Sequence, residues 1–246
     1  MQTQAIVLAA GQGTRMNHPE LPKVLIEAAG RPLLTYVLEV VTHKGIPDPV
    51  IVIGFRADKV RATLGPRRYA LQEAQNGTGS AILSARSELG SFTGAIYLLN
   101  GDHPCITVQT LNDLEAALTA DVAIAVSTGQ VHSIDDRYGR ILRKANGDVD
   151  RIVEYKDATD AERAITEYNA GFYLVRSPWL WSALERVQPS PVTGEYYLTD
   201  IIEFANLDGL RVVPVPVRNQ EEADGVNTPA ELEHVSKILR GRKAQG

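Results

Sequence analysis

Two glycines and two cations follow the first apolar segment of the chain. Residues 5–10 are apolar, and Gly11, Gly13 and Arg15 come directly after them. Glycines let backbone N–H groups approach phosphate oxygens closely, and an arginine can bind a phosphate through two hydrogen bonds. Lys23 follows a proline that fixes the backbone, and it brings a second cation back toward this loop. We expect Arg15 and Lys23 to hold a polyphosphate; the alternative is a plain tight turn. The spacing fits neither the Walker pattern nor the dinucleotide fingerprint.

Asp102 has the position of a metal ligand. It comes just after the apolar segment 95–99, and open α/β sheets place ligands at the carboxyl ends of their strands. Mg²⁺ keeps several waters and binds one or two protein groups plus phosphates, so Asp102 and the side-chain carbonyl of the distant Asn227 would suffice to hold it. The alternative for Asp102 is an Asx-turn. The histidines lack the spacing of zinc ligands, and we expect no zinc site.

Strand-type and helix-type segments alternate from the first residue. This alternation predicts an α/β fold, with a Rossmann-like, mostly parallel sheet and flanking helices. The runs 5–10, 50–53 and 95–99 do not alternate with polar residues, so we expect strands buried on both faces. Apolar residues at helical spacing predict helices over 33–41, after Thr107 and over 198–205. Thr228 to Glu231 combine a capping box with a proline at the first helical position, which predicts a terminal helix.

The composition is that of an ordinary globular protein. Apolar residues make up 44% and charged residues 22% of the 246 positions. The net charge of −5 argues against a nucleic-acid surface. The apolar runs are shorter than the ~18 residues that span a membrane, and the first residues lack the basic region of a signal peptide. Because the single cysteine, Cys105, also indicates a reducing compartment, we expect a cytoplasmic protein without nucleic-acid or membrane partners.

The motifs resemble those of the sugar-phosphate nucleotidyltransferases. More specifically, their order resembles the uridylyltransferase domain of the bacterial bifunctional N-acetylglucosamine-1-phosphate uridylyltransferase/glucosamine-1-phosphate acetyltransferases. The matching segments cover almost the whole chain: 8–16, 21–25, Gln72 with 77–79, 101–102, 138–141, 152–154 with 156–158, Asn169 with Gly171, 194–202 and 225–227. The resemblance implies a GT-A-like nucleotide-diphospho-sugar transferase fold. It covers residues 1–246 as one domain, with a mainly nucleotide-binding half (1–110), a mainly sugar-binding half (111–228) and a terminal helix and tail (229–246).

The resemblance also implies a role for each candidate residue. Catalysis falls to Arg15 and Lys23, and Mg²⁺ to Asp102 and Asn227. The nucleotide would contact Leu8, Ala9, Ala10, Gly11, Gly13, Gln72, Gly77 and Thr78, and the sugar would contact Gly139, Glu154, Asn169, Tyr197 and Thr199. From the residues alone, Gln72 with the glycines after it suits the edge of uracil, and the alternative is a turn that opens a helix. Adjacent tyrosines such as those at 196 and 197 also serve simple packing.

The implied reaction joins UTP and N-acetylglucosamine-1-phosphate, giving UDP-N-acetylglucosamine and pyrophosphate with Mg²⁺ as cofactor. Alternatives are a nucleotidyltransferase for a different sugar-1-phosphate and a non-catalytic regulatory protein that binds nucleotide sugars. Asn100, His103 and Ala170 depart from the family pattern, and they bear on the sugar more than on the chemistry. The chain lacks the six-residue repeats of an acetyltransferase half, so we expect no acetyl transfer and a monomer or weak homo-oligomer. It is either a free-standing enzyme or a fragment of a longer one.

Overall fold

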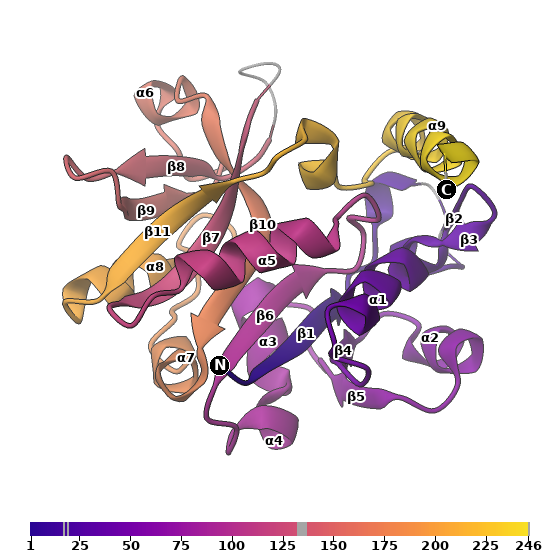
Figure 1. Cartoon of the computed structure of the whole chain (residues 1–246), viewed down its shortest axis with the longest axis horizontal. Helices are drawn as coiled ribbons and strands as arrows, with labels where there is room; N and C mark the ends of the chain where they lie inside the picture. Colours follow the sequence, from indigo (N-terminus) through magenta and orange to yellow (C-terminus); the bar gives the residue numbers. More distant parts are fainter. Residues whose placement is uncertain (17, 19, 132–136, 246) are drawn as a thin grey trace.

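The fold is built on one mixed sheet. The computed structural model describes residues 1–16, 18, 20–131 and 137–245. The strands in these residues are β1 (Thr3–Ala9), β2 (Glu27–Ala28), β3 (Arg31–Pro32), β4 (Val50–Ile53), β5 (Arg68–Leu71), β6 (Ala95–Asn100), β7 (Val122–Gln130), β8 (Arg140–Arg143), β9 (Val149–Val153), β10 (Glu167–Arg176) and β11 (Arg211–Pro216). The sheet has the order β11-β7-β10-β6-β1-β4-β5, with the paired β8 and β9 attached to β10 (Figure 1). β2 and β3 form a separate pair.

Strand direction brings distant residues to one edge of the sheet. β1 is parallel to β4 and β6, β4 is parallel to β5, and β7 is parallel to β11. The predicted α/β class with a mostly parallel sheet is confirmed. β10, in contrast, is antiparallel to both β6 and β7, and its register shifts between Asn169 and Tyr173. Because β10 runs in the opposite direction, Asn169 and the residues beside it lie next to the carboxyl end of β6.

Helices cover both faces of this sheet (Figure 1). Three short 3₁₀ helices, η1 (Thr14–Met16), η2 (Lys23–Leu25) and η3 (Gln220–Ala223), lie in connecting segments. The α-helices of the described residues are α1 (Leu33–His43), α2 (Ala57–Leu64), α3 (Thr78–Ser84), α4 (Arg86–Leu89), α5 (Val108–Ala117), α6 (Asp160–Arg163), α7 (Ser177–Leu184), α8 (Asp200–Leu207) and α9 (Pro229–Gln245). The helices predicted over 33–41, after Thr107, over 198–205 and after Thr228 correspond to α1, α5, α8 and α9.

The core has two main layers because side chains alternate along each strand. In β1, Ile6 faces a cluster that includes residues of α3, α7 and α8. Its neighbours Ala5 and Val7 face a second cluster, which includes residues of α1 and α5. β4 and β6 divide their residues between the same two clusters, so both faces of the central strands are buried, as their uninterrupted apolar runs predict.

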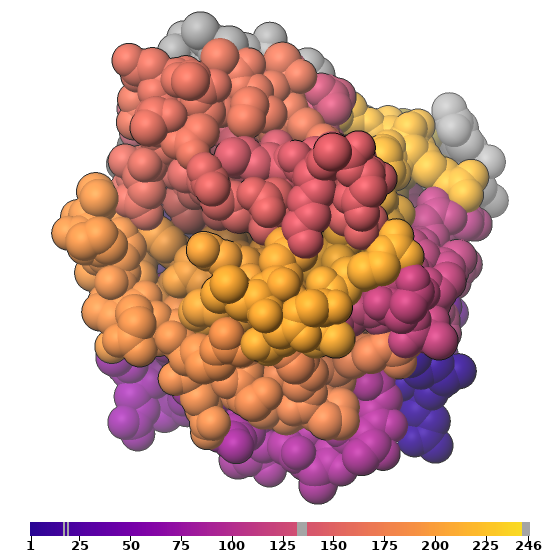
Figure 2. Space-filling model, turned by 90° about the vertical axis from the view of Figure 1, so that its left-hand side faces the viewer, coloured from indigo at the N-terminus to yellow at the C-terminus, as the bar shows by residue number. Residues whose placement is uncertain are grey.

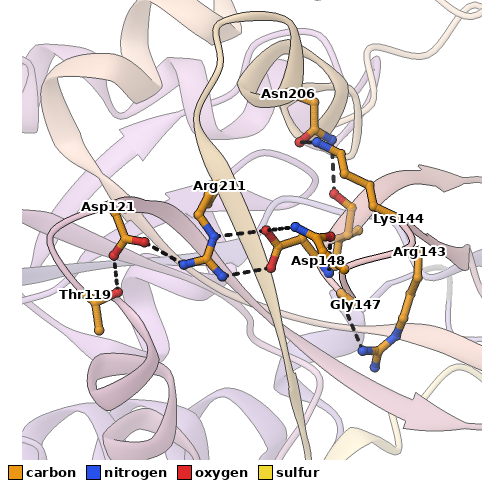
Figure 3. Close-up of polar contacts among 10 residues, drawn as sticks. Thr119, Asp121, Arg143, Lys144, Gly147, Asp148, Asn206 and Arg211 are labelled. Atoms are coloured by element: carbon orange, nitrogen blue, oxygen red, sulfur yellow. Dashed lines mark hydrogen bonds and ion pairs between the residues drawn. The ribbon is translucent and has the colours of Figure 1, made fainter.

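An arginine holds the edge strand β11 to its neighbours (Figure 3). Arg211 donates two hydrogen bonds of 3.0 Å to Asp148 and one of 2.5 Å to Asp121. Asp121 precedes β7 and Asp148 precedes β9, so one side chain connects the starts of three strands. Figure 2 shows this face of the molecule, on which residues around β11 lie between the β8–β9 region and α7. Among the described residues, every helix is too short or too polar to span a membrane.

Candidate active site

The loop after β1 carries the first predicted cation. Ala9 and Ala10 are buried, whereas Gly11 is exposed and has open space beside its α-carbon. Gly13 has a φ of 65°, a left-handed conformation that favours glycine. A Cβ on Gly13 would lie 2.5 Å from the Cβ of Lys23. Glycine at this position therefore makes the turn into η1 and also lets Lys23 pack directly against the loop.

Lys23, on η2, contacts both predicted metal ligands. Its ammonium group forms an ion pair with the Asp102 carboxylate, and its Nζ donates a 2.8 Å hydrogen bond to Asn227 Oδ1. Arg15 Nη2 donates to the same amide oxygen at 2.9 Å. The side chains of Lys23 and Asp102 are only 13% and 15% exposed, so water screens their attraction weakly. Two cations and the two predicted oxygen ligands, from four separate segments, thus meet at one edge of the sheet.

A glycine places Asp102 at the end of β6. The backbone N–H of Gly101 donates to Leu8 O at 2.8 Å, and a Cβ on Gly101 would lie 2.7 Å from that oxygen. Only glycine lets this turn pack so closely on β1. The carbonyl of Asp102 accepts a 3.0 Å hydrogen bond from Val226 N. This bond ties the turn to the segment that carries Asn227, the second predicted ligand.

The Asp102 carboxyl group is surrounded by positive or donating groups. Burial alone would raise its pKa, but the charge of Lys23 and hydrogen bonds from Lys23 and His103 hold that pKa well below its usual range. His103 Nδ1 lies 2.8 Å from Asp102 Oδ1, whereas Lys23 pairs with Oδ2. The carboxylate is therefore ionised at neutral pH.

The start of α9 orients Asn227. The carboxylate of Glu231 accepts hydrogen bonds from the backbone N–H groups of Asn227 (2.7 Å) and Thr228 (2.8 Å). The Thr228 hydroxyl accepts in turn from Glu231 N at 3.3 Å, which completes the predicted capping box. Asn227 Nδ2 donates to Gly225 O at 3.3 Å, so Oδ1 is left facing the two cations. The residues that cap the helix therefore also orient the predicted ligand Asn227.

The predicted base-binding segment is held together by its own side chains. Gln72 is buried, and its Nε2 donates to Gly77 O (3.0 Å) and to the Ser80 hydroxyl (2.8 Å). Gly77 has a φ of 125°, and a Cβ there would lie 2.3 Å from Tyr196 O. The Thr78 hydroxyl accepts from the N–H of Leu198 at 3.0 Å. Residues 72–80 are thus joined to the segment that leads into α8.

On the predicted sugar side, Glu154 follows directly after β9, as its position behind two apolar residues predicts. The Thr199 hydroxyl, itself buried, donates to Glu154 Oε1 at 3.0 Å. Burial raises the pKa of Glu154, the hydrogen bond from Thr199 lowers it by less, and the nearby Asp157 raises it further. Glu154 is thus a carboxylate in a site that solvates its charge poorly.

The other predicted sugar residues surround this carboxylate. Gly139 O accepts from Asn169 N at 2.9 Å, and a Cβ on Gly139 would lie 3.5 Å from Glu154 Oε2. Asn169 Oδ1 accepts from Gly171 N at 2.9 Å. The hydroxyl of Tyr197 lies 2.6 Å from that of Thr193, in the loop before α8. The residues just before β8, just after β9 and near the start of β10 therefore lie close together.

Glu154 lines three adjoining cavities, of about 810, 400 and 80 Å³. Arg15 lines the two larger ones, and Asn227 lines the cavity of about 400 Å³. The smallest is lined by residues from both halves of the chain, including Leu8, Thr78, Asn169 and Thr199. The structure thus brings predicted phosphate, nucleotide and sugar residues together along one cleft.

The cleft also contains residues that the sequence did not single out as ligands. Arg137 lines both larger cavities, and Lys156 and Arg163 line the largest. Asn100 lines the two smaller ones, and its Nδ2 donates to Gly171 O at 3.3 Å. Arg137 is exposed, so neither an apolar periodicity nor a motif spacing marks it as a ligand in the sequence. The sequence indicates a role for it only through its position next to Tyr138-Gly139.

The Asp102–Asn227 pair suits a hard divalent cation. Both side-chain oxygens lie within hydrogen-bonding reach of a single atom, Lys23 Nζ, so they are close enough to share one small cation. One carboxylate and one amide oxygen match Mg²⁺, which completes its shell with water and phosphate. The described part of the chain contains no cluster of three or more His, Cys, Asp or Glu that could hold a metal. The donor set therefore fits a metal that arrives with an anionic substrate.

The fold has a close counterpart among solved structures. The crystal structure of a UDP-glucose pyrophosphorylase complexed with UDP-glucose superimposes with a TM-score of 0.76, over 98% of this chain and 100% of the other, at 18% sequence identity. The expected nucleotide-diphospho-sugar transferase fold is thereby confirmed. At this identity the likeness concerns the fold alone.

Sequence comparison gives the family. A profile of the MobA-like NTP transferase domain matches residues 5–207, so the chain belongs to that family. It is 42% identical to the bifunctional protein GlmU of Anaeromyxobacter sp. (strain Fw109-5) and 41% identical to that of Pelotomaculum thermopropionicum. These alignments cover 98% of this chain, but only 50% and 53% of the relatives. The chain thus spans about half the length of the curated relatives it matches, and the resemblance to a bifunctional bacterial protein is confirmed.

Proposed function

We propose that the protein is a uridylyltransferase that joins UTP and N-acetylglucosamine-1-phosphate. Family membership supports nucleotidyl transfer, and the relatives named GlmU support a nucleotide sugar as product. The observation that carries the proposal is the meeting of Arg15, Lys23, Asp102 and Asn227 at the edge of a cleft. Two mutually repelling anions can be aligned only where positive charge is concentrated in this way.

In the proposed reaction, a phosphate oxygen of the sugar phosphate attacks the α-phosphorus of UTP. A new P–O bond forms, the bond between the α- and β-phosphates breaks, and pyrophosphate leaves. The nucleophile is already ionised at neutral pH, so no side chain has to remove a proton. Arg15 and Lys23 hold the triphosphate and stabilise the charge that builds up on the leaving group. Their work is alignment and charge neutralisation.

The metal-binding role falls to Asp102 and Asn227. Mg²⁺ would supply further positive charge against the attacking and α-phosphate groups. His103 and the capping box at the start of α9 hold the two side chains in orientation. Lys23 Nζ contacts Asp102 Oδ2 and Asn227 Oδ1 in this structure. If these two oxygens held Mg²⁺ instead, Lys23 would be the side chain best placed to turn toward the phosphates.

Recognition of the two substrates is assigned to opposite ends of the cleft. Because Gln72 Nε2 is already bonded to the loop, we assign its Oε1 to the N–H of uracil. Leu8, Ala9, Ala10, Gly11, Gly13, Gly77 and Thr78 supply the backbone and walls around the nucleotide. Glu154 accepts hydrogen bonds from sugar hydroxyls, with Thr199 orienting it and Gly139, Asn169 and Tyr197 around it. The proposal further includes a cytoplasmic location and a monomer or weak homo-oligomer.

A panel of substrates tests the proposal. UTP, dTTP and CTP are each combined with glucose-, galactose-, glucosamine- and N-acetylglucosamine-1-phosphate, and pyrophosphate release is measured with and without Mg²⁺. We expect release only with Mg²⁺, and fastest from UTP with N-acetylglucosamine-1-phosphate. A preference for another sugar phosphate would correct the assigned sugar. Nucleotide binding without pyrophosphate from any pair would indicate a regulatory protein instead.

A further inference from the structure

The imidazole ring of His103 is fixed on several sides. It is only 8% exposed, and its Nδ1 lies 2.8 Å from Asp102 Oδ1. The ring meets Phe172 edge to face, with 5.2 Å between ring centroids. Such a ring has little freedom to turn, so the position of Nδ1 relative to the carboxylate is set by packing.

The same ring packs against the segment that carries Asn227. A Cβ built on Gly225 would lie 2.8 Å from His103 Cε1 and 2.9 Å from Nε2. Only glycine lets the backbone come this close to the ring. Gly225 O in turn accepts the hydrogen bond from Asn227 Nδ2 that orients its side chain. His103 therefore touches both segments that carry the proposed ligands.

The hydrogen bond to Asp102 has a defined direction. An ionised carboxylate only accepts hydrogen bonds, so Nδ1 must carry the proton and donate it to Oδ1. The carboxylate torsion of an aspartate is broad, so without such a donor the group would rotate over a wide range. With Oδ1 held by His103, Oδ2 is the oxygen presented to the cation beside it, which in this structure is Lys23 Nζ.

We propose that His103 is a positioning residue of the divalent-cation site. Its Nδ1–H fixes the carboxylate of Asp102 through Oδ1, and its ring packs against Gly225 in the segment that carries Asn227. Asp102 Oδ2 and Asn227 Oδ1 consequently face the same cation. His103 is not itself a ligand, and the inference rests on the proposed function because it refines the metal site of that function.

Binding of Mn²⁺, used in place of Mg²⁺ in the presence of UTP, tests this role by electron paramagnetic resonance without any turnover. His103→Phe keeps an aromatic ring and removes the donor. We expect it to weaken Mn²⁺ binding about 10-fold or more, because groups that orient metal ligands typically contribute 10- to 100-fold in affinity. His103→Asn keeps an N–H near the position of Nδ1. Because the orienting hydrogen bond is retained, its affinity for Mn²⁺ should stay within about threefold of that of the parent protein. The matched control is His234→Phe, because His234 also faces an aspartate but lies on the exposed side of α9.

The possible results separate the inference from the proposed function. Failure of the parent protein to bind Mn²⁺ with UTP would refute the metal site itself. Binding by the parent, with His103→Phe within twofold of it, would refute the positioning role alone. Equal weakening in His103→Phe and His103→Asn would contradict the role of the hydrogen bond. If circular dichroism shows that His103→Phe does not fold, Gly225→Ala is tested in its place. Its methyl group must displace the His103 ring, so we expect the same loss of Mn²⁺ affinity. An unchanged Mn²⁺ affinity would overturn the inference.

Discussion

Replacing Lys23 with methionine removes one cation and keeps most of its aliphatic stem. The ion pair with Asp102 is largely buried, and removing one partner of a buried pair costs about 3–5 kcal/mol. His103 still donates to the carboxylate, so we expect the substitution to cost about 2–3 kcal/mol, at or just below the lower limit of that range. For a chain of this size each kcal/mol lowers Tm by about 2–4 °C, so the expected fall is about 4–12 °C.

Thermal unfolding followed by circular dichroism, with and without Mg²⁺, measures this effect. Mg²⁺ should raise the Tm of Lys23→Met more than that of the parent protein, because the ion no longer competes with the ammonium group for Asp102 and Asn227. Turnover should fall about 10²–10³-fold, as when one preorganised donor is lost. Lys59→Met is the control, because Lys59 contacts Glu20 only at the exposed surface, through a 3.9 Å ion pair and a hydrogen bond to the Glu20 carbonyl, and such exposed contacts contribute little. A Lys23→Met protein with the parent Tm and near-full turnover would refute the reasoning.

Three further substitutions test other parts of the account. Thr199→Val removes the hydrogen bond that lowers the pKa of Glu154, so the loss of sugar-phosphate binding at acid pH should begin at a higher pH; an unshifted pH profile of KM would contradict this. Burial, with Glu203 and Asp157 nearby, raises the pKa of Asp200 to about 6, so its contribution to stability is present in acid and is lost as the pH rises through 6. Asp200→Asn should therefore be more stable than the parent to urea at pH 7.5, by about 1–2 kcal/mol after solvent screening, and equal to it near pH 4; the same difference at both pH values would refute this. Gly77→Ala brings a methyl group 2.3 Å from Tyr196 O and should cost more than about 3 kcal/mol in urea unfolding, whereas Gly194→Ala, with φ 73° and open space, should cost about 1 kcal/mol; equal losses would be inconsistent with the structure.

Local sequence patterns predicted the elements that hold the site. The apolar run 50–53 matches β4 to the residue, and the Thr228–Glu231 capping box marks the start of α9. Both signals act within a few residues, where backbone preference and side-chain chemistry are directly coupled. The placement of Glu154 behind β9 followed from the same kind of local reasoning.

Contacts between segments that lie far apart in the sequence could not be predicted from such local patterns. The reversal of β10 depends on which strands become neighbours, which a single sequence does not encode locally. The contacts of His103 with Asp102, Phe172 and Gly225 join three segments, and only the folded chain brings them together. Arg137 shares the cleft with Arg15 for the same reason. The family resemblance rests on the order of the motifs along the chain, and that order does not predict these contacts.

The central claim is that one cation is shared by Asp102 and Asn227 when nucleotide is bound. A crystal of the protein with UTP and Mn²⁺, measured at the manganese absorption edge, tests it directly through the anomalous difference map. The account predicts a peak about 2.0–2.3 Å from Asp102 Oδ2 and Asn227 Oδ1, with Lys23 Nζ moved onto the phosphates. A bound nucleotide whose manganese lies away from these two oxygens, with the Lys23–Asp102 pair intact, would contradict it.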